Sequence, residues 1–271
     1  MFKPDDNNFE QSHFAAVLAL TKENLEKYKK EEKALSDELY TLLETYGAKD
    51  IEALSMIDNL QVMYERAQHE AARAERARQK PFFGRIDFVD DKHKSNDTIY
   101  IGKVGISRDV THLEVIDWRA PVANSYYESH IGEVTYSVPG EGSFVIDLKK
   151  KRTYEIKDDT LLSFFDSDVV ANDELLNRYL SQNKKAVLGE IIATIQKEQN
   201  DIIRQSPYKS IIVQGAAGSG KTTVAMHRIS YILYNYEKDF KPADFYIVGS
   251  NKLLLNYITS VLPDLDVNGV R

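Results

Sequence analysis

The stretch that decides most about this chain reads Ser210-Ile-Ile-Val-Gln-Gly-Ala-Ala-Gly-Ser-Gly-Lys-Thr-Thr-Val-Ala-Met226. In it, a short apolar run is followed by a glycine-rich segment and then by a helical pattern. Because Gly215, Gly218 and Gly220 carry no Cβ, the backbone between Gly215 and Lys221 can curl until several N–H groups point at one centre. The positive end of the following helix adds to this field, so the stretch predicts a site for phosphate groups.

Lys221 and Thr222 complete the G-x-x-x-x-G-K-[ST] pattern of a nucleotide-binding P-loop. In that pattern the lysine reaches the β- and γ-phosphates and the threonine hydroxyl holds Mg²⁺, so both are predicted catalytic residues. A strand at Ile211–Val213 and a helix at Val224–Tyr234 are expected as flanks. The structural alternative is a glycine turn that matches the pattern by chance. The predicted binding residues are Gly215, Ala216, Ala217, Gly218, Ser219, Gly220, Lys221, Thr222 and Thr223, with Thr222 as the metal ligand.

Composition narrows the class of protein. The 271 residues are enough for two domains, and 42% hydrophobic residues are enough to bury their cores. No apolar run approaches the ~18 residues of a membrane span and no signal peptide is visible, so a cytoplasmic location is expected. Cys is absent and the six His residues lack ligand spacing, which excludes disulfides and predicts no transition metal. The net charge of -7 argues against a chain that coats nucleic acid with its whole surface.

Two long helices are predicted at the start of the chain. Apolar residues recur with alternating steps of four and three over Glu10–Tyr46, and the same period returns over Asp50–Lys80, between Gly47 and Pro81. The short break predicts an antiparallel coiled-coil hairpin over residues 10–80, which projects from the body as an arm. The alternative is two helices packed lengthwise on a larger core. The predicted seams are Phe14, Leu18, Thr21, Leu25, Tyr28, Glu32, Leu35, Leu39, Leu42 and Tyr46, and Ile57, Leu60, Tyr64, Ala67, Ala71 and Ala74.

The turn between the two helices is acidic. It carries several carboxylates against Lys49 alone, while basic residues gather at the opposite end of the hairpin. Glu44, Asp50 and Glu52 are therefore candidate partner-binding residues. The equal alternative is an ordinary solvated helix end, which explains the same charges.

Residues 81–170 change to short strand-like runs broken by Gly, Pro, Asn and Asp, which predicts a small antiparallel β module. Within it, Asp117–Val122 places the only Trp between an acid and a base. We interpret this segment as a structural corner, in which an aspartate bonded to an arginine lies beside a buried indole. Strands are expected at Gly84–Phe88, Thr98–Ile101, His112–Ile116, Val134–Val138, Phe144–Leu148 and Arg152–Ile156.

Residues 171–271 are predicted to begin a P-loop, RecA-like α/β domain, which makes the whole chain a multidomain α+β protein. A helix is expected from Asn172, and a second buried strand at Phe245–Val248. A complete ATPase of this type also needs an acidic Mg²⁺ ligand and an arginine finger, and neither is found before Arg271. We therefore expect an N-terminal piece of a longer protein that is inactive in isolation.

A resemblance to known families rests on several of these stretches. Gln199 lies on the helix before the loop, where its amide can bond adenine or simply face solvent. Together with Gly215–Thr222 and Ala225–Ile229, it resembles the first ATPase subdomain of UvrD/Rep-like superfamily 1 helicases. Phe83–Phe88 and Val115–Val122, with the N-terminal helices, resemble the HelD-like family of RNA polymerase-associated, helicase-like proteins.

The resemblance implies ATP and Mg²⁺ as cofactors, and Gln199 as the residue that reads adenine. It also implies that Ser250, Asn251 and Lys252 correspond to a segment that contacts single-stranded DNA in true helicases. HelD-like proteins insert their hairpin into the secondary channel of RNA polymerase and promote release and recycling of stalled enzyme. The expected function is therefore an ATP-dependent, helicase-like factor that binds RNA polymerase through its arm. The alternative is an ATP-dependent superfamily 1 DNA helicase.

Overall fold

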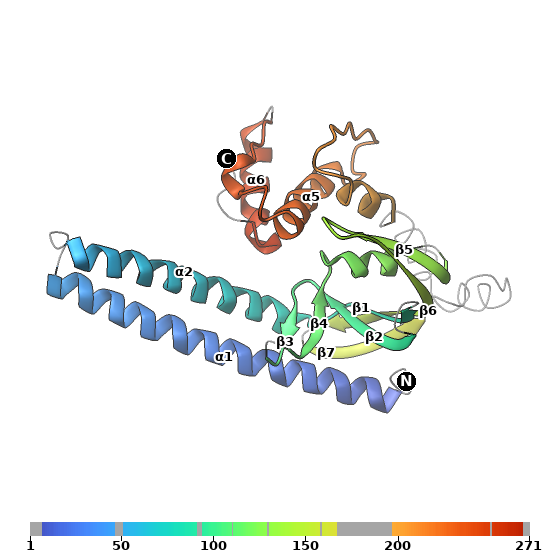
Figure 1. Ribbon diagram of the computed structural model, residues 1–271, viewed down its shortest axis with the longest axis horizontal. Helices are drawn as coiled ribbons and strands as arrows, with labels where there is room; N and C mark the ends of the chain where they lie inside the picture. The colour runs from blue at the N-terminus through green and yellow to red at the C-terminus, as the bar shows by residue number, and fades with distance from the viewer. Residues whose placement is uncertain are drawn as a thin grey trace. The chain divides into compact units, whose positions relative to one another are not determined.

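The protein is described by a computed structural model that covers residues 7–46, 51–90, 94–109, 111–128, 130–157, 159–166, 197–249 and 251–267 (Figure 1). The chain divides into two compact units. Unit 1 comprises Met1–Arg85, Thr98–Trp118 and Arg152–Phe165, and unit 2 comprises Ile86–Asp97, Arg119–Lys151 and Asp166–Arg271. The helix expected to begin at Asn172 lies outside the described residues. No helix in the described ranges is long and apolar enough to cross a membrane.

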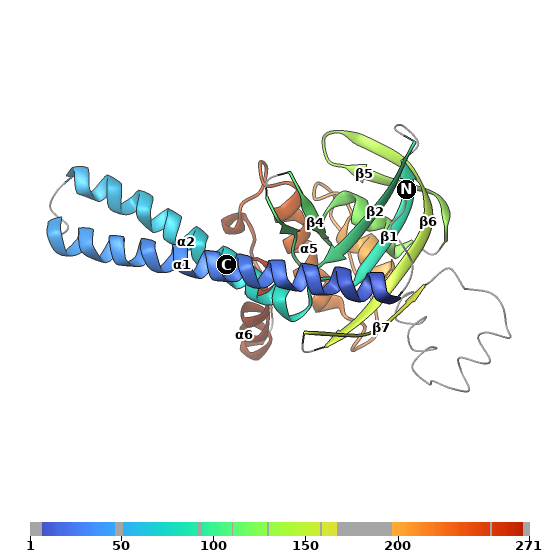
Figure 2. The same cartoon turned by 90° about the horizontal axis from the view of Figure 1, so that it is seen from below.

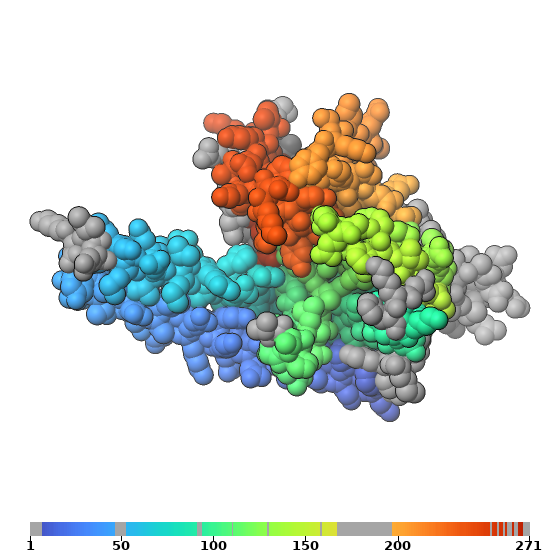
Figure 3. Space-filling view, in the orientation of Figure 1, coloured from blue at the N-terminus to red at the C-terminus, as the bar shows by residue number. Residues whose placement is uncertain are grey.

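Unit 1 begins with two long helices, α1 (Asn7–Tyr46) and α2 (Ile51–Gln79), close to the bounds that the apolar period predicts. They lie side by side along their length (Figures 1, 2 and 3). At 1.5 Å per residue, the 40 residues of α1 span about 60 Å. In the far half of the helix pair, residues 28–46 and 51–67, the buried cluster comprises Leu35, Leu60 and Ala67, with Leu39, Leu42 and Tyr64 packed against it.

The root of the helix pair, residues 7–25 and 71–79, packs on strands of the same unit. Phe82 is fully buried there, and its ring centroid lies 4.9 Å from that of Tyr100 and 4.8 Å from that of Tyr154. Burial of these large side chains supplies the main stabilisation of unit 1. The core cluster consists of Phe14, Val17, Leu20, Ala77, Phe82, Tyr100, Val104, Ile106, Val115, Tyr154, Ile156 and Leu161.

A buried carboxylate ties α1 to the sheet of unit 1. Glu10 is 0% exposed, and its Oε1 accepts hydrogen bonds from Arg85 Nη1 (2.6 Å) and Arg152 Nη1 (2.8 Å). Its Oε2 accepts from the hydroxyls of Tyr100 (3.2 Å) and Tyr154 (2.8 Å). Burial, followed by the nearby Glu10 charge, raises the pKa of the Tyr100 hydroxyl. The sequence analysis did not predict this cluster, because its members are far apart in the chain.

The strands form one mixed sheet in the order β3-β4-β2-β1-β6-β5, with β7 paired to β6. The expectation of an antiparallel module is wrong for one pair, because β2 and β4 are parallel, with Tyr100 opposite Val115. After β2 the chain passes through β3 and returns as β4 between β3 and β2, so β4 takes the direction of β2. The strands are β1 (Gly84–Asp90), β2 (Ser95–Gly102), β3 (Ile106–Ser107), β4 (Leu113–Asp117), β5 (Gly132–Val138), β6 (Gly142–Lys157) and β7 (Thr160–Asp166).

Two expected strands are in fact one. Phe144–Leu148 and Arg152–Ile156 both belong to the 16-residue strand β6, which runs straight through the lysines at 149–151. Polar character suggested a break there, but the segment contains no glycine or proline to end a strand. Leu148, Arg152 and Tyr154 are buried whereas Lys149 and Glu155 are exposed, so alternate side chains take opposite faces as a strand requires.

The described C-terminal part of unit 2 is helical. Residues 197–203 form a helix, followed by α5 (Lys221–Asn235), the short 3₁₀ segments η3 (Pro242–Asp244) and η4 (Leu262–Leu265), and α6 (Lys252–Val261). Its core cluster comprises Met226, Ile258, Leu262 and Val267.

The strands expected at Ile211–Val213 and Phe245–Val248 are not present. Both segments lack regular secondary structure, and Ile212 and Val248 are 96% and 95% exposed. A strand needs a hydrogen-bonded neighbour, and within the described ranges neither segment pairs with another strand. Part of their apolar surface is still used for packing, because Ile247 lies against the cluster formed by Met226, Ile258, Leu262 and Val267.

Candidate functional site

The glycine loop, residues 215–220, is a tight turn that leads directly into α5. Gly218 and Gly220 have φ values of 79° and 84°, in the left-handed region that favours glycine. Ser219 N donates to Ala216 O (3.3 Å), and Val224 N donates to Gly220 O (2.8 Å) to open the helix. An added Cβ at position 215 would lie 2.7 Å from Ser219 Oγ, so a side chain there would require the Ser219 hydroxyl to move.

Lys221 folds back over this loop. Its Nζ donates to Gly215 O (2.8 Å) and Ala216 O (2.7 Å), and lies 3.5 Å from Ser219 Oγ. The first turn of α5 also holds Thr222, which is half-buried, and Thr223, which is exposed. The structure therefore brings the predicted lysine, both hydroxyl residues and the glycines of the pattern together at one helix N-terminus.

Gln199 reaches the loop from a different helix. Its Nε2 donates to Ser219 O at 3.3 Å. An added Cβ on Gly220 would lie 2.7 Å from the same Nε2, so a side chain there would displace the Gln199 amide. Two stretches that are separate in the sequence thus meet at the glycine loop.

Arg228 is a positioning residue that the sequence analysis did not assign. From α5, its Nη1 donates to the carbonyl oxygens of Ile202 (3.1 Å), Ile203 (3.1 Å) and Gln205 (2.7 Å), and its Nη2 donates to Ser206 O (3.0 Å). These carbonyls lie at and just beyond the C-terminal end of helix 197–203, where a cation is favoured. Burial lowers the pKa of Arg228. The only sequence signal was an arginine at one-turn spacing from the buried residues of α5.

The candidate nucleic-acid-binding and partner-binding residues lie outside the glycine loop. Asn251 caps α6, since its Oδ1 accepts from Leu253 N at 2.8 Å, and Lys252 is exposed. Ser250 lies outside the described residues. Glu44 is exposed near the end of α1, whereas Asp50 and the side chain of Glu52 lie outside what the structure describes.

The Asp117–Val122 corner includes a buried arginine that pairs with a carboxylate from a distant part of the chain. Arg119 is 4% exposed, and its Nη2 pairs with Asp266 Oδ2 at 2.8 Å. The carboxylate that meets this arginine is thus far along the chain, and its position could not be read from local sequence. Among the described residues, no group of three His, Asp or Glu side chains is arranged to hold a metal ion.

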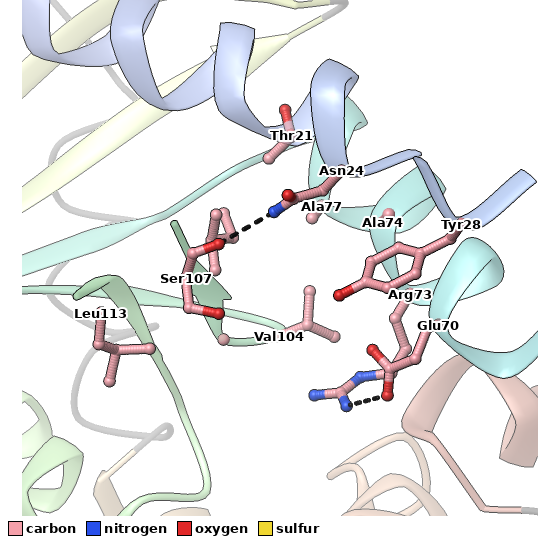
Figure 4. Close-up of a pocket in the computed structure, with 12 residues that line it drawn as sticks. Thr21, Asn24, Tyr28, Glu70, Arg73, Ala74, Ala77, Val104, Ser107 and Leu113 are labelled. Atoms are coloured by element: carbon pink, nitrogen blue, oxygen red, sulfur yellow. Dashed lines mark hydrogen bonds and ion pairs between the residues drawn. The ribbon is translucent and has the colours of Figure 1, made fainter. Parts of the chain in front are cut away.

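Unit 1 has a pocket of about 230 Å³ at the root of the helix pair (Figure 4). On its wall, Asn24 Nδ2 donates to Ser107 O at 3.1 Å, and Arg73 pairs with Glu70 at 3.3 Å. Burial, and then the Glu70 charge, raises the pKa of the Tyr28 hydroxyl on the same wall. These contacts hold α1, α2 and the β3 region together, and they explain the pocket as part of that junction.

Comparison with known families decides the identity of the chain. A family model described as the N-terminal domain of DNA helicase IV HelD matches residues 8–182. The chain belongs to this family. The match covers α1, α2 and all the described strands, and ends before Gln199 and the glycine loop. No curated protein matches the chain. The HelD family implies an ATPase of the helicase type in the full-length protein.

Proposed function

We propose that this HelD-family chain carries the ATP site of a helicase-like ATPase. The observation that carries the proposal is the meeting of Gln199, Lys221 and the glycine loop around Ser219. Gln199 would bond adenine, the loop amides and Lys221 would hold the β- and γ-phosphates, and Thr222 would bind Mg²⁺. The bound Mg²⁺ would neutralise charge that develops on the phosphates. The left-handed φ values of Gly218 and Gly220 fit a loop whose backbone curls around a ligand.

The ATP site is tested in the complete protein by Lys221→Ala. We expect loss of ATP turnover with an unchanged melting temperature, because the ammonium group bonds only loop atoms in the structure. Lys209→Ala, at an exposed position before the loop, is the matched control. Turnover at the wild-type level in Lys221→Ala would refute the assigned role. Residues 1–271 alone are expected to hydrolyse ATP no faster than background.

We further propose that the helix pair, residues 10–80, is an arm that binds RNA polymerase in its secondary channel and promotes release and recycling of stalled enzyme. Residues 81–170 would form the β-rich body and residues 171–271 the nucleotide-binding part. The proposed polymerase-binding role of the arm is supported by the far half of the helix pair, which is long, narrow and rich in exposed apolar side chains. Such surface is typical of protein interaction sites. The exposed residues are Tyr40, Leu43, Tyr46, Leu54, Met56, Val62 and Met63.

Polymerase binding is tested by pull-down with the complete protein and with a version that lacks the far half of the helix pair, residues 28–67, so that the root residues in the core of unit 1 are kept. Capture should require residues 28–67, and equal capture by both forms would refute the proposal. The acidic turn is tested separately by Asp50→Lys with Glu52→Lys. The control reverses Glu23 and Glu26, which are exposed on α1 near the root. Only the turn variant should weaken capture or release, since only its charges lie in the segment proposed to meet the polymerase.

A DNA helicase is the second candidate, because the matching family is described as DNA helicase IV. In that case Ser250, Asn251 and Lys252 would contact single-stranded DNA, and the exposed Lys252 would bind phosphate. Strand displacement on a forked duplex separates the two functions. Unwinding that depends on ATP and is lost in Lys252→Ala, without any polymerase capture, would favour the helicase.

A further inference from the structure

The corner at residues 119–128 contacts the helix that carries Gln199. It begins at Arg119 and continues through the 3₁₀ helix η2 (Pro121–Tyr127). Asn200, next to Gln199 in the chain, is 4% exposed, and its Nδ2 donates to Asn124 Oδ1 at 2.7 Å. One turn earlier on the same face, Lys197 pairs with Glu128 at 3.1 Å.

Arg204, just after the helix at residues 197–203, makes further hydrogen bonds between this helix and the corner. Its Nε donates to Asn200 Oδ1 (2.9 Å), and its Nη1 donates to the carbonyl oxygens of Ala120 (3.3 Å) and Arg119 (3.5 Å). The guanidinium also lies 5.1 Å from the ring centroid of Tyr231, a buried residue of α5. A planar guanidinium can make these hydrogen bonds and this stacking contact together, which a lysine cannot.

The same corner contacts α5 through Arg119. Its Nη1 donates to Ser230 Oγ at 3.1 Å, and its guanidinium lies 4.7 Å from the Tyr234 ring. The carbonyl of Arg119 accepts from Asn235 Nδ2 at 3.0 Å. Residues 119–128 therefore contact both helices that flank the glycine loop, one before it and one after it.

The loop itself has little support of its own. Residues 210–219 are exposed and lack regular secondary structure apart from a turn. The separation between Gln199 and the loop is therefore set by their direct hydrogen bond and by the contacts of the two flanking helices. Arg228 links those helices directly, and the corner links them a second time.

We propose that the corner at residues 119–128 is a positioning element for adenine recognition, and that Arg204 is the residue that couples it to Gln199. The inference rests on the proposed ATP site. A displaced helix 197–203 would move the Gln199 amide away from the base while leaving the glycine loop and Lys221 in place. Arg204 thus acts through Gln199, and its loss should affect base recognition more than phosphate binding.

The test measures affinities of the complete protein for ATP, GTP and inorganic triphosphate. Triphosphate has no base, so its affinity measures phosphate binding by the glycine loop alone. In Arg204→Ala, we expect ATP affinity to fall roughly tenfold, as for loss of one or two buried hydrogen bonds, and ATP/GTP preference to fall with it. Triphosphate affinity should change by less than about twofold. Asn124→Ala should shift ATP affinity in the same direction, and Arg204→Lys should give an intermediate value. The control is Lys238→Ala, at an exposed position after α5.

The outcomes separate this inference from the proposed ATP site. If wild type binds ATP and Lys221→Ala does not, while Arg204→Ala binds all three ligands as wild type does, only the positioning role is refuted. Equal weakening of all three ligands in Arg204→Ala would also refute it, since that indicates general disruption. If wild type binds none of the three ligands, both proposals fall. Selective loss of ATP affinity and of base preference supports the inference.

Discussion

The root and the far half of the helix pair carry the same apolar period but use it in different ways. At the root, Phe14, Val17 and Leu20 are buried because the sheet of unit 1 covers a second side of α1. In the far half only the partner helix covers each seam, so Leu35 is buried but Tyr40 is 64% exposed and Val62 is 66% exposed. The comparison teaches that a heptad pattern predicts which face meets a partner helix, whereas the number of packed layers decides how much becomes buried.

The largest loss in the free energy of unfolding is expected at the root of the helix pair, from Glu10→Ala. The substitution removes a buried carboxylate that four side chains contact, and breaking such an ion pair costs about 3–5 kcal/mol. Chemical denaturation of residues 1–271 would measure the change. Glu23→Ala, on the exposed face of α1, is the control and should change stability by less than about 0.5 kcal/mol. Equal effects of the two substitutions would show that the root does not depend on this cluster.

A smaller loss in the free energy of unfolding is expected in the far half of the helix pair, from Leu35→Ala. Only one layer of contacts surrounds Leu35, so the cost should be about 2–3 kcal/mol, at the low end for a buried leucine. Hydrogen exchange should increase in residues 28–46 and 51–67 and remain slow in the root. Leu43→Ala, 48% exposed on the same helix, serves as the control. Exchange that rises equally in both halves would mean that they unfold as a single cooperative unit.

Val62→Ser with Met63→Ser should barely alter stability, by less than about 0.5 kcal/mol, because both side chains are more than half exposed. If the far half binds RNA polymerase as proposed, the same pair should lower capture several-fold. Pull-down and thermal melting of one preparation give both values. If polymerase capture is unchanged, the exposed apolar side chains no longer support the proposal that the arm binds RNA polymerase.

The smallest expected effect on stability comes from the carboxyl of Asp109, in the turn between β3 and β4. Hydrogen bonds from the Thr111 hydroxyl and amide, and then from His112, lower the pKa of the Asp109 carboxyl. A lowered folded-state pKa adds stability above the unfolded value of about 3.9, and this stability is lost as pH falls through the folded pKa. Carboxyl NMR shifts should place the Asp109 titration below that of free aspartate. A titration at the ordinary value would contradict the hydrogen-bonded turn.

Much of the helical structure was predictable because it follows from local rules. The apolar period located α1 and α2, and glycine and proline located their ends, since these residues act on the backbone where they stand. The helix expected after the loop at Val224–Tyr234 is present as α5, which begins three residues earlier, at Lys221. Strand prediction was less successful: β6 runs through a lysine segment that suggested a break, and β7 was not assigned.

The remaining features required contacts between distant parts of the chain. The sequence was sufficient for the long helices, the glycine loop and its lysine, because side-chain period and the freedom of glycine are properties of neighbouring residues. It was not sufficient for the four groups around Glu10, the pairing of Arg119 with Asp266, or the parallel alignment of β2 with β4. Each of these depends on which surfaces meet after folding. A buried charge selects its partner by position in space and not by distance along the chain, so only the tertiary structure decided those contacts.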